Sequence, residues 1–338
     1  MPLNEFDIIS KYFANTELAF GAKELVLGIG DDCAIFTPEP NEQLVVSMDM
    51  LVEGVHFLEN SDPTLLGQRS LLVNLSDLAA MGARPLFFTL AVSLPEVDER
   101  WLEGFSKGLA TVARANSCPL VGGDTTSSHP KRGGRTLCIQ VHGAVPKGKA
   151  LTRGGAQVGD SVYVSGTIGD SAAGLQLLQG PDTRGLSDQQ QEFLHCAFYQ
   201  PESRISLGIA LRELASAAID ISDGLASDLG HIIASSRVGA SVDTDRLPIS
   251  EAFKAMVPEE ARTEIALGGG DDYELCFTIA PRHEEALRKR CSQLGVTVTR
   301  IGQIDLEPGL RWKKQGEELK LDIKGYRHFE AARRLVNG

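Results

Sequence analysis

Aspartate residues recur beside small residues inside otherwise apolar stretches, and they are the residues of this sequence best suited to chemistry. Carboxylate oxygens are hard ligands, and Mg²⁺ is commonly held by a few carboxylates together with substrate phosphates. Phosphoryl transfer needs in-line positioning and neutralisation of the charge on phosphate oxygens, which metal ions supply. The aspartate-bearing segments together therefore favour a metal site for phosphate chemistry. They are GIGDDCAIF, VVSMDMLVEGVHF, LLVNLSDLAAMGARP, VGGDTT, AIDISDGLASDLGHI and GGGDDYELCF.

Each of these segments also has an ordinary structural interpretation. An Asp beside Gly usually occupies a turn, and Asp223 is placed where an acid would favour the start of a helix. Asp77 is the hardest to explain in this way, because it lies within a predicted helix among leucines and no Lys or Arg stands one turn away on its own face. A buried carboxylate is costly unless it is paired or binds a metal.

Glycine-rich turns offer weaker signals for phosphate binding. Residues 162–175 read as a strand, a Gly-rich turn and a helix start, where backbone N–H groups could hold a phosphate. The Gly-Gly-Asp run at 122–124 would let backbone approach a nucleotide closely. The segment GAVPKGK at 143–149 fails as a Walker A motif because Ala150 replaces the Ser or Thr that binds Mg²⁺. Dinucleotide-binding, protein-kinase and G-x-S-x-G hydrolase motifs are absent from the sequence.

Local patterns predict helices and strands mixed in both halves, so the class is α/β or α+β. Predicted helices cover 4–13, 62–83, 98–116, about 170–178 and 282–294, and a helix, a strand and a helix follow one another over 203–233. Predicted strands cover 25–36, 43–57, 85–94, 137–145, 161–165, 273–280 and 297–301. A Gly- and Lys-rich stretch over 146–160 marks a domain boundary near its start. It divides the chain into domains 1–148 and 149–338.

Composition indicates which classes of partner are excluded and in which compartment the protein is expected. The 33 Lys and Arg against 45 Asp and Glu give a formal net charge of −12, which argues against nucleic acid or an anionic membrane as the main partner. The six cysteines show neither a C-x-x-C pattern nor zinc-finger spacing, and we expect reduced, buried thiols in a cytoplasmic protein. The N-terminus does not read as a signal peptide, and no stretch has the apolar length of a membrane span.

The order of these motifs resembles the thiamine-monophosphate kinase family, from about Phe6 to His328. NLSDLAAMGA together with IDISDGL and GG-x-DYEL carries the resemblance. The related aminoimidazole ribonucleotide synthetases, selenophosphate synthetases and a hydrogenase maturation factor share the fold and the ATP chemistry. The resemblance implies a two-domain aminoimidazole ribonucleotide synthetase-like fold in which the N-terminal domains of two chains pair into a dimeric β-barrel. ATP and thiamine monophosphate would lie in a cleft that the C-terminal domain completes.

The resemblance also assigns roles to single positions. Several Mg²⁺ ions would bridge the phosphates of ATP and substrate, and no general base is assigned because a phosphate nucleophile is already anionic near neutral pH. The expected metal ligands are Asp32, Ser47, Met48 (through its backbone oxygen), Asp49, Asp77, Asp124, Asp220 and Asp223. The expected ATP contacts are Gly123, Asp124, Arg153 and Ser222. The expected substrate contacts are His56, Asp271 and Ile323.

Two positions depart from the family pattern, and both concern the substrate. Asp271 stands where family members often carry Glu, which keeps the charge but shortens the reach. Ile323 precedes Lys324-Gly325-Tyr326 in a segment where an aromatic residue often stacks on the substrate, and Tyr326 is a possible substitute.

Three other functions stay open at this point. A related ATP-dependent synthetase of the same superfamily would use the same fold, although no Cys-bearing segment of the selenophosphate-synthetase kind precedes GIGDDCA. A metal-dependent phosphohydrolase would release phosphate without ATP. A non-catalytic metal- or nucleotide-binding protein would bind Mg²⁺-nucleotide without turnover.

Overall fold

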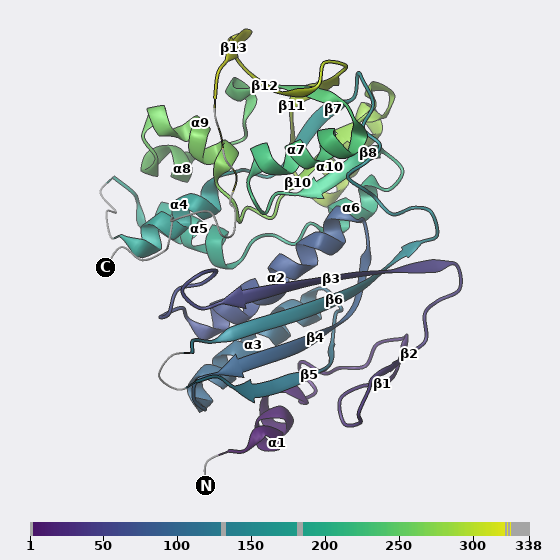
Figure 1. The fold of residues 1–338 in the computed structure, drawn as a ribbon, viewed down its shortest axis with the longest axis vertical. Coiled ribbons are helices and arrows are strands. Elements are labelled where there is room, and N and C mark those ends of the chain that lie inside the picture. Colours follow the sequence, from purple (N-terminus) through teal and green to yellow (C-terminus); the bar gives the residue numbers. More distant parts are fainter. Residues whose placement is uncertain (1–2, 130–132, 181–184, 322, 324, 326–338) are drawn as a thin grey trace. The chain divides into compact units, whose positions relative to one another are not determined.

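The protein is described by a computed structural model that covers residues 3–129, 133–180, 185–321, 323 and 325 (Figure 1). The chain forms two compact units, and the main division between them falls between Gly148 and Lys149. The short segment Ala79–Gly82 belongs to the second unit. Within the described ranges, no helix has both the length and the apolar character that crossing a membrane would require.

The first unit opens with the predicted N-terminal helix. Helix α1 (Glu5–Ile8) continues into a π-helical turn, η1 (Ile9–Phe13). Asn4 and Asp7 form a reciprocal capping box, in which each backbone N–H donates to the other side chain at 3.0 Å. Two short strands, β1 (Leu25–Leu27) and β2 (Ile35–Phe36), then pair with each other where one long strand was predicted.

A four-stranded sheet forms the body of the first unit. Its strands are β3 (Glu42–Val52), β6 (Thr136–Pro146), β4 (Arg84–Leu94) and β5 (Leu120–Ser127), in that order across the sheet. The β3–β6 and β6–β4 pairs are antiparallel, whereas β4 and β5 are parallel and are joined through helix α3 (Glu99–Ala115). The sheet therefore has β3 and β5 as its two edge strands.

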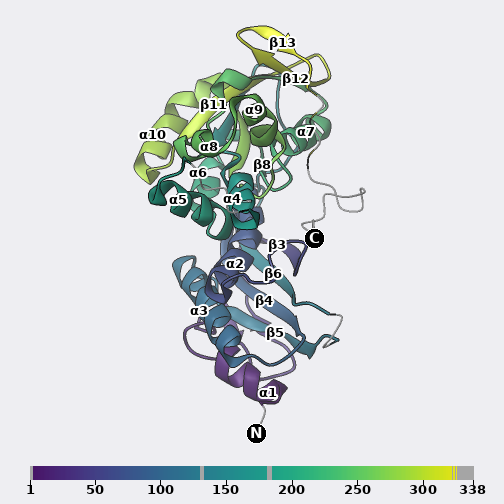
Figure 2. The same cartoon turned by 90° about the vertical axis from the view of Figure 1, so that its left-hand side faces the viewer.

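Two helices cover one face of this sheet (Figure 2). Helix α2 (Pro63–Ala80) begins after Asp62, whose Oδ1 accepts hydrogen bonds from the N–H groups of Thr64 and Leu65, and Asp98 caps α3 in the same way. On β4 and β6, the strand residues that face the helices are buried and apolar, whereas on β3 this face also carries the half-buried side chains of Ser47 and Asp49. On the opposite face, β3 presents alternate apolar side chains that are each at least half exposed, namely Leu44, Val46, Met48 and Met50.

A seven-stranded sheet organises the second unit, in the order β13-β12-β9-β11-β7-β10-β8. All neighbouring pairs are antiparallel except β9 with β12. The strands are β7 (Ser161–Ser165), β8 (Ala215–Asp220), β9 (Gly239–Asp243), β10 (Leu275–Ile279), β11 (Val298–Asp305), β12 (Gly309–Lys314) and β13 (Glu317–Leu319).

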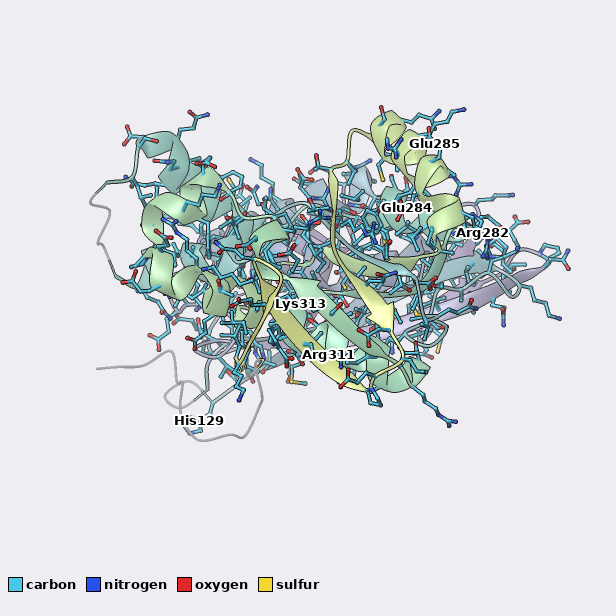
Figure 3. All side chains as sticks on the ribbon, turned by 90° about the horizontal axis from the view of Figure 1, so that it is seen from above. His129, Arg282, Glu284, Glu285, Arg311 and Lys313 are labelled. Atoms are coloured by element: carbon cyan, nitrogen blue, oxygen red, sulfur yellow. The ribbon has the colours of Figure 1, made fainter. Side chains whose placement is uncertain are left out.

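Helices lie on both faces of this sheet. The main apolar core packs one face against α7, α8, α9 and parts of α4 and α5. Helix α10 lies over the other face, where the Ser161 hydroxyl donates to Glu284 at 2.7 Å. On β12, Trp312 is buried while Arg311 and Lys313 project from the strand's other face (Figure 3). The helices are α4 (Asp170–Gln179), α5 (Asp188–Tyr199), α6 (Ile205–Leu211), α7 (Leu225–Ser236), α8 (Glu251–Met256), α9 (Glu259–Gly268) and α10 (Glu284–Leu294), with 3-10 turns η2 (Thr244–Arg246) and η3 (Pro281–His283).

The mixed α and β class is confirmed, and several local predictions need correction. The strand predicted over 273–280 begins only at Leu275, because Tyr273 has a left-handed backbone with φ of 52°. Strands β5, β9, β12 and β13 were not predicted. The expectation of buried thiols is wrong for Cys33, which is exposed, whereas Cys118, Cys276 and Cys291 are buried.

Candidate functional site

Three of the predicted metal ligands meet between β3 and α2 in the first unit. The Ser47 hydroxyl donates to Asp77 Oδ2 at 2.5 Å, and both side chains are half-buried. The backbone N–H of Asp49 donates to Asn74 Oδ1 at 3.1 Å, which fixes this part of the strand against the helix one turn before Asp77. Because side chains alternate along a strand, Ser47 and Asp49 both face α2.

The carboxylates of Asp49 and Asp77 influence each other. Burial, together with the smaller effect of the negative charge of Asp77, raises the pKa of Asp49 to about 6. Two neighbouring carboxylates that resist ionisation together are stabilised by a bound cation. The pair is therefore electrostatically prepared for a divalent ion.

Asp124 lies apart from this group within one chain. It is exposed on edge strand β5, pairs in register with Ala91 of β4, and faces the side of the sheet away from the helices. With about 4.8 Å between neighbouring strands, the two edges are separated by roughly 14 Å. One chain thus does not bring Asp124 to Asp49.

Gly123 is required by the packing of β5. A Cβ atom at this position would stand 1.8 Å from the carbonyl oxygen of Leu90 on the neighbouring strand. Gly123 itself is exposed, so its backbone is accessible as expected for a nucleotide contact.

The remaining predicted metal positions of the first unit are exposed. Asp32 follows β1 in a turn where its N–H donates to Asp31 Oδ1 at 2.8 Å. The Met48 side chain is exposed on the face of the sheet opposite the helices, and the family resemblance implies that this residue would bind metal through its backbone oxygen.

His56 occupies the turn that follows β3. Its Nδ1 accepts a hydrogen bond from the N–H of Val52 at 3.0 Å, which places the proton of the neutral ring on Nε2. The neighbouring acid Glu53 is used structurally, because its carboxylate receives both the backbone N–H and the guanidinium of Arg135, at 2.8 and 2.7 Å.

In the second unit, the predicted acids lie where β8 ends. Asp220 is the last residue of β8, is buried, and pairs in register with Leu275 of β10. Ser222 and Asp223 follow in the turn before α7 and are half-buried. This turn runs beside the segment that precedes β10, since the N–H of Asp271 donates to the carbonyl of Ser222 at 2.8 Å.

Asp228 lies one turn into α7 and supports this turn. Its Oδ2 accepts the backbone N–H of Asp223 at 3.1 Å. Burial and the negative charge of Asp223 together raise the pKa of Asp228 to about 7, against the opposing effects of backbone hydrogen bonds and of the positive charge of Arg153. Arg153 is itself exposed, and its carbonyl accepts a hydrogen bond from Ser236 at the end of α7.

The predicted substrate contacts of the second unit approach the same turn. Asp271 is half-buried beside Ser222. Ile323 packs against the apolar core of the unit, and a Cβ atom built on Gly325 would stand 2.8 Å from the carbonyl oxygen of Asp223. This short C-terminal segment therefore passes close to Asp223. Lys324 and Tyr326 lie outside the described residues.

The Gly-rich turn before α4 does not offer the phosphate site that the sequence suggested. The carboxylate of Asp272 accepts the N–H of Gly169 at 2.8 and 3.0 Å and that of Ser171 at 3.5 Å. Burial raises the pKa of Asp272 well above its usual range, although these hydrogen bonds act against the shift. The carboxylate of Asp272 thus occupies the N-terminal end of α4, and the prediction that this turn binds a phosphate is wrong.

The donor set suits Mg²⁺ better than a softer metal. Across the described parts of the chain, no three His, Cys, Asp or Glu side chains converge closely enough to enclose an ion by themselves. Mg²⁺ usually keeps several waters and binds through one or two carboxylates plus substrate phosphates. The oxygen donors of Ser47, Asp49 and Asp77 fit that mode, whereas zinc sites in proteins are usually built from His and Cys, which this group lacks.

Arg204 and Glu274 form a buried ion pair in the second unit, in which the guanidinium donates to the carboxylate at 2.6 and 2.5 Å. We expect Arg204→Met to lower the free energy of unfolding by about 3–5 kcal/mol, because Glu274 would be left buried without its guanidinium partner. Urea denaturation would measure this loss. Arg288→Met is the matched control: its exposed pair with Glu285 should contribute less than about 1 kcal/mol. Equal, small effects of both changes would show that the buried pair is not stabilising.

Similarity to known proteins extends over almost the whole chain. Residues 30–145 match the family model for the N-terminal domain of AIR synthase related proteins, and residues 157–313 match that for the C-terminal domain. The thiamine-monophosphate kinase of Escherichia coli (strain K12) is 46% identical over 331 residues, covering 97% of this chain and 99% of the relative. The thiamine-monophosphate kinase of Bacillus subtilis (strain 168) is 34% identical over 334 residues, covering 97% and 100%.

Solved structures agree with these similarities. The thiamine-monophosphate kinase of Stenotrophomonas maltophilia K279a has a TM-score of 0.84 at 43% identity and covers 94% of this chain and 99% of that one. AaThiL complexed with AMPPCP and TMP has a TM-score of 0.75 at 28% identity and covers 97% and 99%. The hydrogenase maturation protein HypE of Escherichia coli, at 19% identity and a TM-score of 0.74, shares the fold.

Proposed function

The chain belongs to the thiamine-monophosphate kinase family, and on that premise we propose that it transfers the γ-phosphoryl group of ATP to thiamine monophosphate. The full-length similarity to kinases of this substrate carries the proposal. The oxygen-rich group at Ser47, Asp49 and Asp77 agrees with it, because phosphoryl transfer depends on positioning and charge neutralisation. A phosphohydrolase would not account for the similarity to ATP-dependent kinases.

The reaction that follows is a direct, in-line exchange of one P–O bond for another. A phosphate oxygen of thiamine monophosphate attacks the γ-phosphorus, and the bond from that phosphorus to the β,γ-bridging oxygen breaks. The products are thiamine diphosphate and ADP. The second pKa of a phosphate monoester is about 6, so the nucleophile is already a dianion near neutral pH and the protein needs no general base.

The predicted residues take roles in positioning and binding. Asp49, Asp77 and the Asp220 turn would hold Mg²⁺, which when bound neutralises charge on the phosphate oxygens. Arg153 can offer a planar guanidinium to ATP phosphates, with Gly123 and Ser222 as further contacts. His56, with its proton on Nε2, can donate to the substrate phosphate. The proposed metal set is Asp32, Ser47, the backbone of Met48, Asp49, Asp77, Asp124, Asp220 and Asp223, and Asp271 and Ile323 complete the substrate contacts.

We further infer a homodimer formed by the first unit. The helix-free face of its sheet carries the exposed apolar row Leu44, Val46, Met48 and Met50, which would be covered by a second copy. Edge strands β3 and β5 carry Asp49 and Asp124, which one chain keeps apart. Pairing between copies would close the sheet toward a barrel and let β5 of one chain approach β3 of the other.

Membership of the kinase family also suggests a cytoplasmic enzyme whose small-molecule partners are ATP and thiamine monophosphate. All six cysteines are free thiols, which suits a reducing compartment. The net charge of −12 gives no basis for binding nucleic acid or an anionic membrane.

Product analysis tests the proposed reaction. The purified protein is mixed with ATP, Mg²⁺ and thiamine monophosphate, with unphosphorylated thiamine as the control acceptor. We expect thiamine diphosphate from the monophosphate alone. Phosphate release from thiamine monophosphate without ATP would instead identify a phosphohydrolase.

The affinity for Mg²⁺ should depend on pH through Asp49. Its pKa of about 6 exceeds the ordinary value of 3.8, so protons compete with the metal below pH 6. In the metal-free protein, the stability contributed by protonated Asp49 is present at low pH and lost as pH rises through 6. Calorimetric titration with Mg²⁺ alone should show affinity about tenfold weaker at pH 5 than at pH 7. Asp49→Asn should remove this dependence, and a wild-type affinity that is flat over this range would contradict it.

A further inference from the structure

The segment Gly269–Glu274, just before β10, has an unusual backbone. Asp271 and Tyr273 adopt left-handed conformations with φ of 68° and 52°. Such conformations are uncommon for residues other than glycine, and for a bulky residue such as Tyr they persist only where the surroundings hold them. Strained backbone of this kind concentrates at functional sites, so its supports and the side chains that it displays are informative.

Backbone hydrogen bonds fix one side of the segment. The N–H groups of Asp271 and Tyr273 donate to the carbonyls of Ser222 and Ile221, each at 2.8 Å, and the N–H of Ile221 returns a bond to the carbonyl of Glu274 at 2.8 Å. The segment is thereby tied to the turn that follows Asp220.

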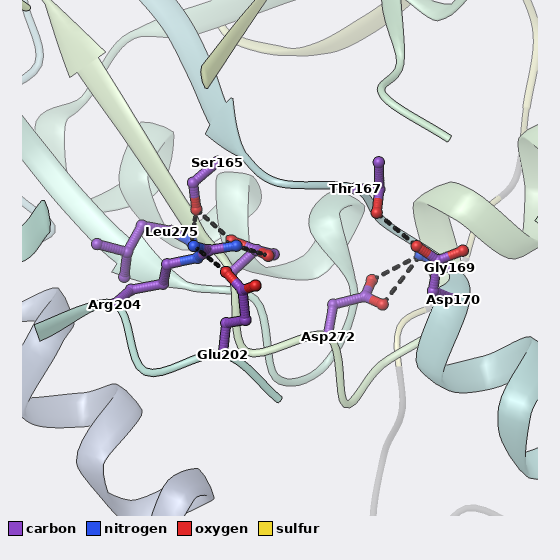
Figure 4. Close-up of polar contacts among 9 residues, drawn as sticks. Ser165, Thr167, Gly169, Asp170, Glu202, Arg204, Asp272 and Leu275 are labelled. Atoms are coloured by element: carbon purple, nitrogen blue, oxygen red, sulfur yellow. Dashed lines mark hydrogen bonds and ion pairs between the residues drawn. The ribbon is translucent and has the colours of Figure 1, made fainter. Parts of the chain in front are cut away.

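Two buried carboxylates anchor the segment from within the unit (Figure 4). Asp272 is 8% exposed and receives the N–H of Gly169 at 2.8 and 3.0 Å. Glu274 is equally buried and receives a forked pair of bonds from Arg204 at 2.6 and 2.5 Å, together with the hydroxyl of Ser165. Both acids are therefore engaged in holding the backbone.

The other two side chains of the segment, those of Asp271 and Tyr273, are less buried than those of Asp272 and Glu274. Asp271 and Tyr273 are half-buried, and the Tyr273 hydroxyl donates to Asp271 Oδ1 at 2.8 Å. This bond restricts rotation of a short carboxylate whose backbone is already fixed. A carboxylate held in one orientation binds a donor with a smaller loss of conformational entropy than a mobile one.

We propose that Tyr273 is a positioning residue that orients Asp271 toward an N–H donor or cationic ring of the phosphate-accepting substrate. Asp272 and Glu274 maintain the strained backbone from which the side chains of Asp271 and Tyr273 project. The inference rests on the proposed role of Asp271 as a substrate contact. In thiamine monophosphate, the aminopyrimidine supplies N–H donors and the thiazolium supplies the positive charge, so either end can satisfy this carboxylate.

Steady-state kinetics of Tyr273→Phe test the proposal, because Phe keeps the ring and removes only the hydroxyl. Loss of a hydrogen bond to a charged group should raise KM for thiamine monophosphate about fivefold to tenfold, with KM for ATP and kcat almost unchanged. Tyr163→Phe, in the same unit and stacked on Phe277, is the matched control and should change neither KM.

Asp271→Asn and the double variant separate positioning from a general structural effect. If Tyr273 acts through Asp271, adding Tyr273→Phe to Asp271→Asn should raise KM for thiamine monophosphate no further. If Tyr273→Phe leaves this KM unchanged while Asp271→Asn raises it, Tyr273 has no positioning role and the substrate role of Asp271 stands. If neither variant changes it, both assignments are wrong although the kinase reaction itself is intact. A wild-type protein that makes no thiamine diphosphate overturns the proposed function and the inference with it.

Discussion

Asp77→Asn is expected to lower kcat for thiamine diphosphate formation by about 10³-fold or more while the protein stays folded. The amide keeps the size of the side chain and can still accept the Ser47 hydroxyl through its oxygen. It removes the negative charge that, with Asp49, would hold the metal on the phosphates. Charge neutralisation by a metal is worth several kcal/mol in the transition state, and each 1.36 kcal/mol is tenfold in rate.

Stability provides the internal control for this variant. Because the charge of Asp77 opposes ionisation of Asp49, its removal should leave the melting temperature in metal-free buffer unchanged or higher. Glu103→Gln, on the exposed side of neighbouring helix α3, should retain full activity. Near-wild-type kcat in a folded Asp77→Asn protein would remove Asp77 from the metal set.

Mixing two inactive variants is expected to restore activity if two chains share each site. Asp49→Asn and Asp124→Asn should each be inactive as homodimers, because each lacks a proposed ligand in both sites. In a heterodimer, the β3 of one chain and the β5 of the other are both intact, so one of its two sites is whole. With half of the dimers mixed after co-expression, about a quarter of wild-type activity should return.

A second mixture tests whether the restored activity comes from a site to which both chains contribute ligands, or merely from the formation of mixed dimers. Asp49→Asn with Asp77→Asn should not complement through the β3–β5 contact, because both positions lie on the Ser47 side of one chain. Activity is measured at equal total protein, with dimer formation confirmed by sedimentation. A mixture of Asp49→Asn and Asp124→Asn that stays inactive although heterodimers form would place Asp124 in a site of its own chain.

Local chemistry made the helix starts predictable. Asn4, Asp62 and Asp98 are each short acceptors followed by a helical pattern, and each caps its helix with side-chain bonds to the next N–H groups. The same reasoning failed for β5, since Gly122 and Gly123 read as a turn. At Gly123 the glycine instead reflects the close approach of strand β4, because a Cβ atom there would stand 1.8 Å from the carbonyl oxygen of Leu90. A sequence pattern does not reveal this contact.

The sequence could name candidate residues for the site but not how they are arranged. Asp77 and Asp49 stood out because acids are rare in such apolar surroundings. The partners that decide each acid's role are distant in sequence, as Arg135 is for Glu53 and Gly169 is for Asp272. Tyr273 carried no signal at all, because its role depends on a backbone angle and a hydroxyl contact.

The central claim is direct transfer from ATP to thiamine monophosphate, and the fate of the γ-phosphorus tests it most directly. ATP labelled at that phosphorus is incubated with the protein, Mg²⁺ and thiamine monophosphate, and the products are separated. We expect the label in the terminal phosphate of thiamine diphosphate, in a one-to-one ratio with ADP. Label released as inorganic phosphate, with no labelled thiamine diphosphate, would contradict the account.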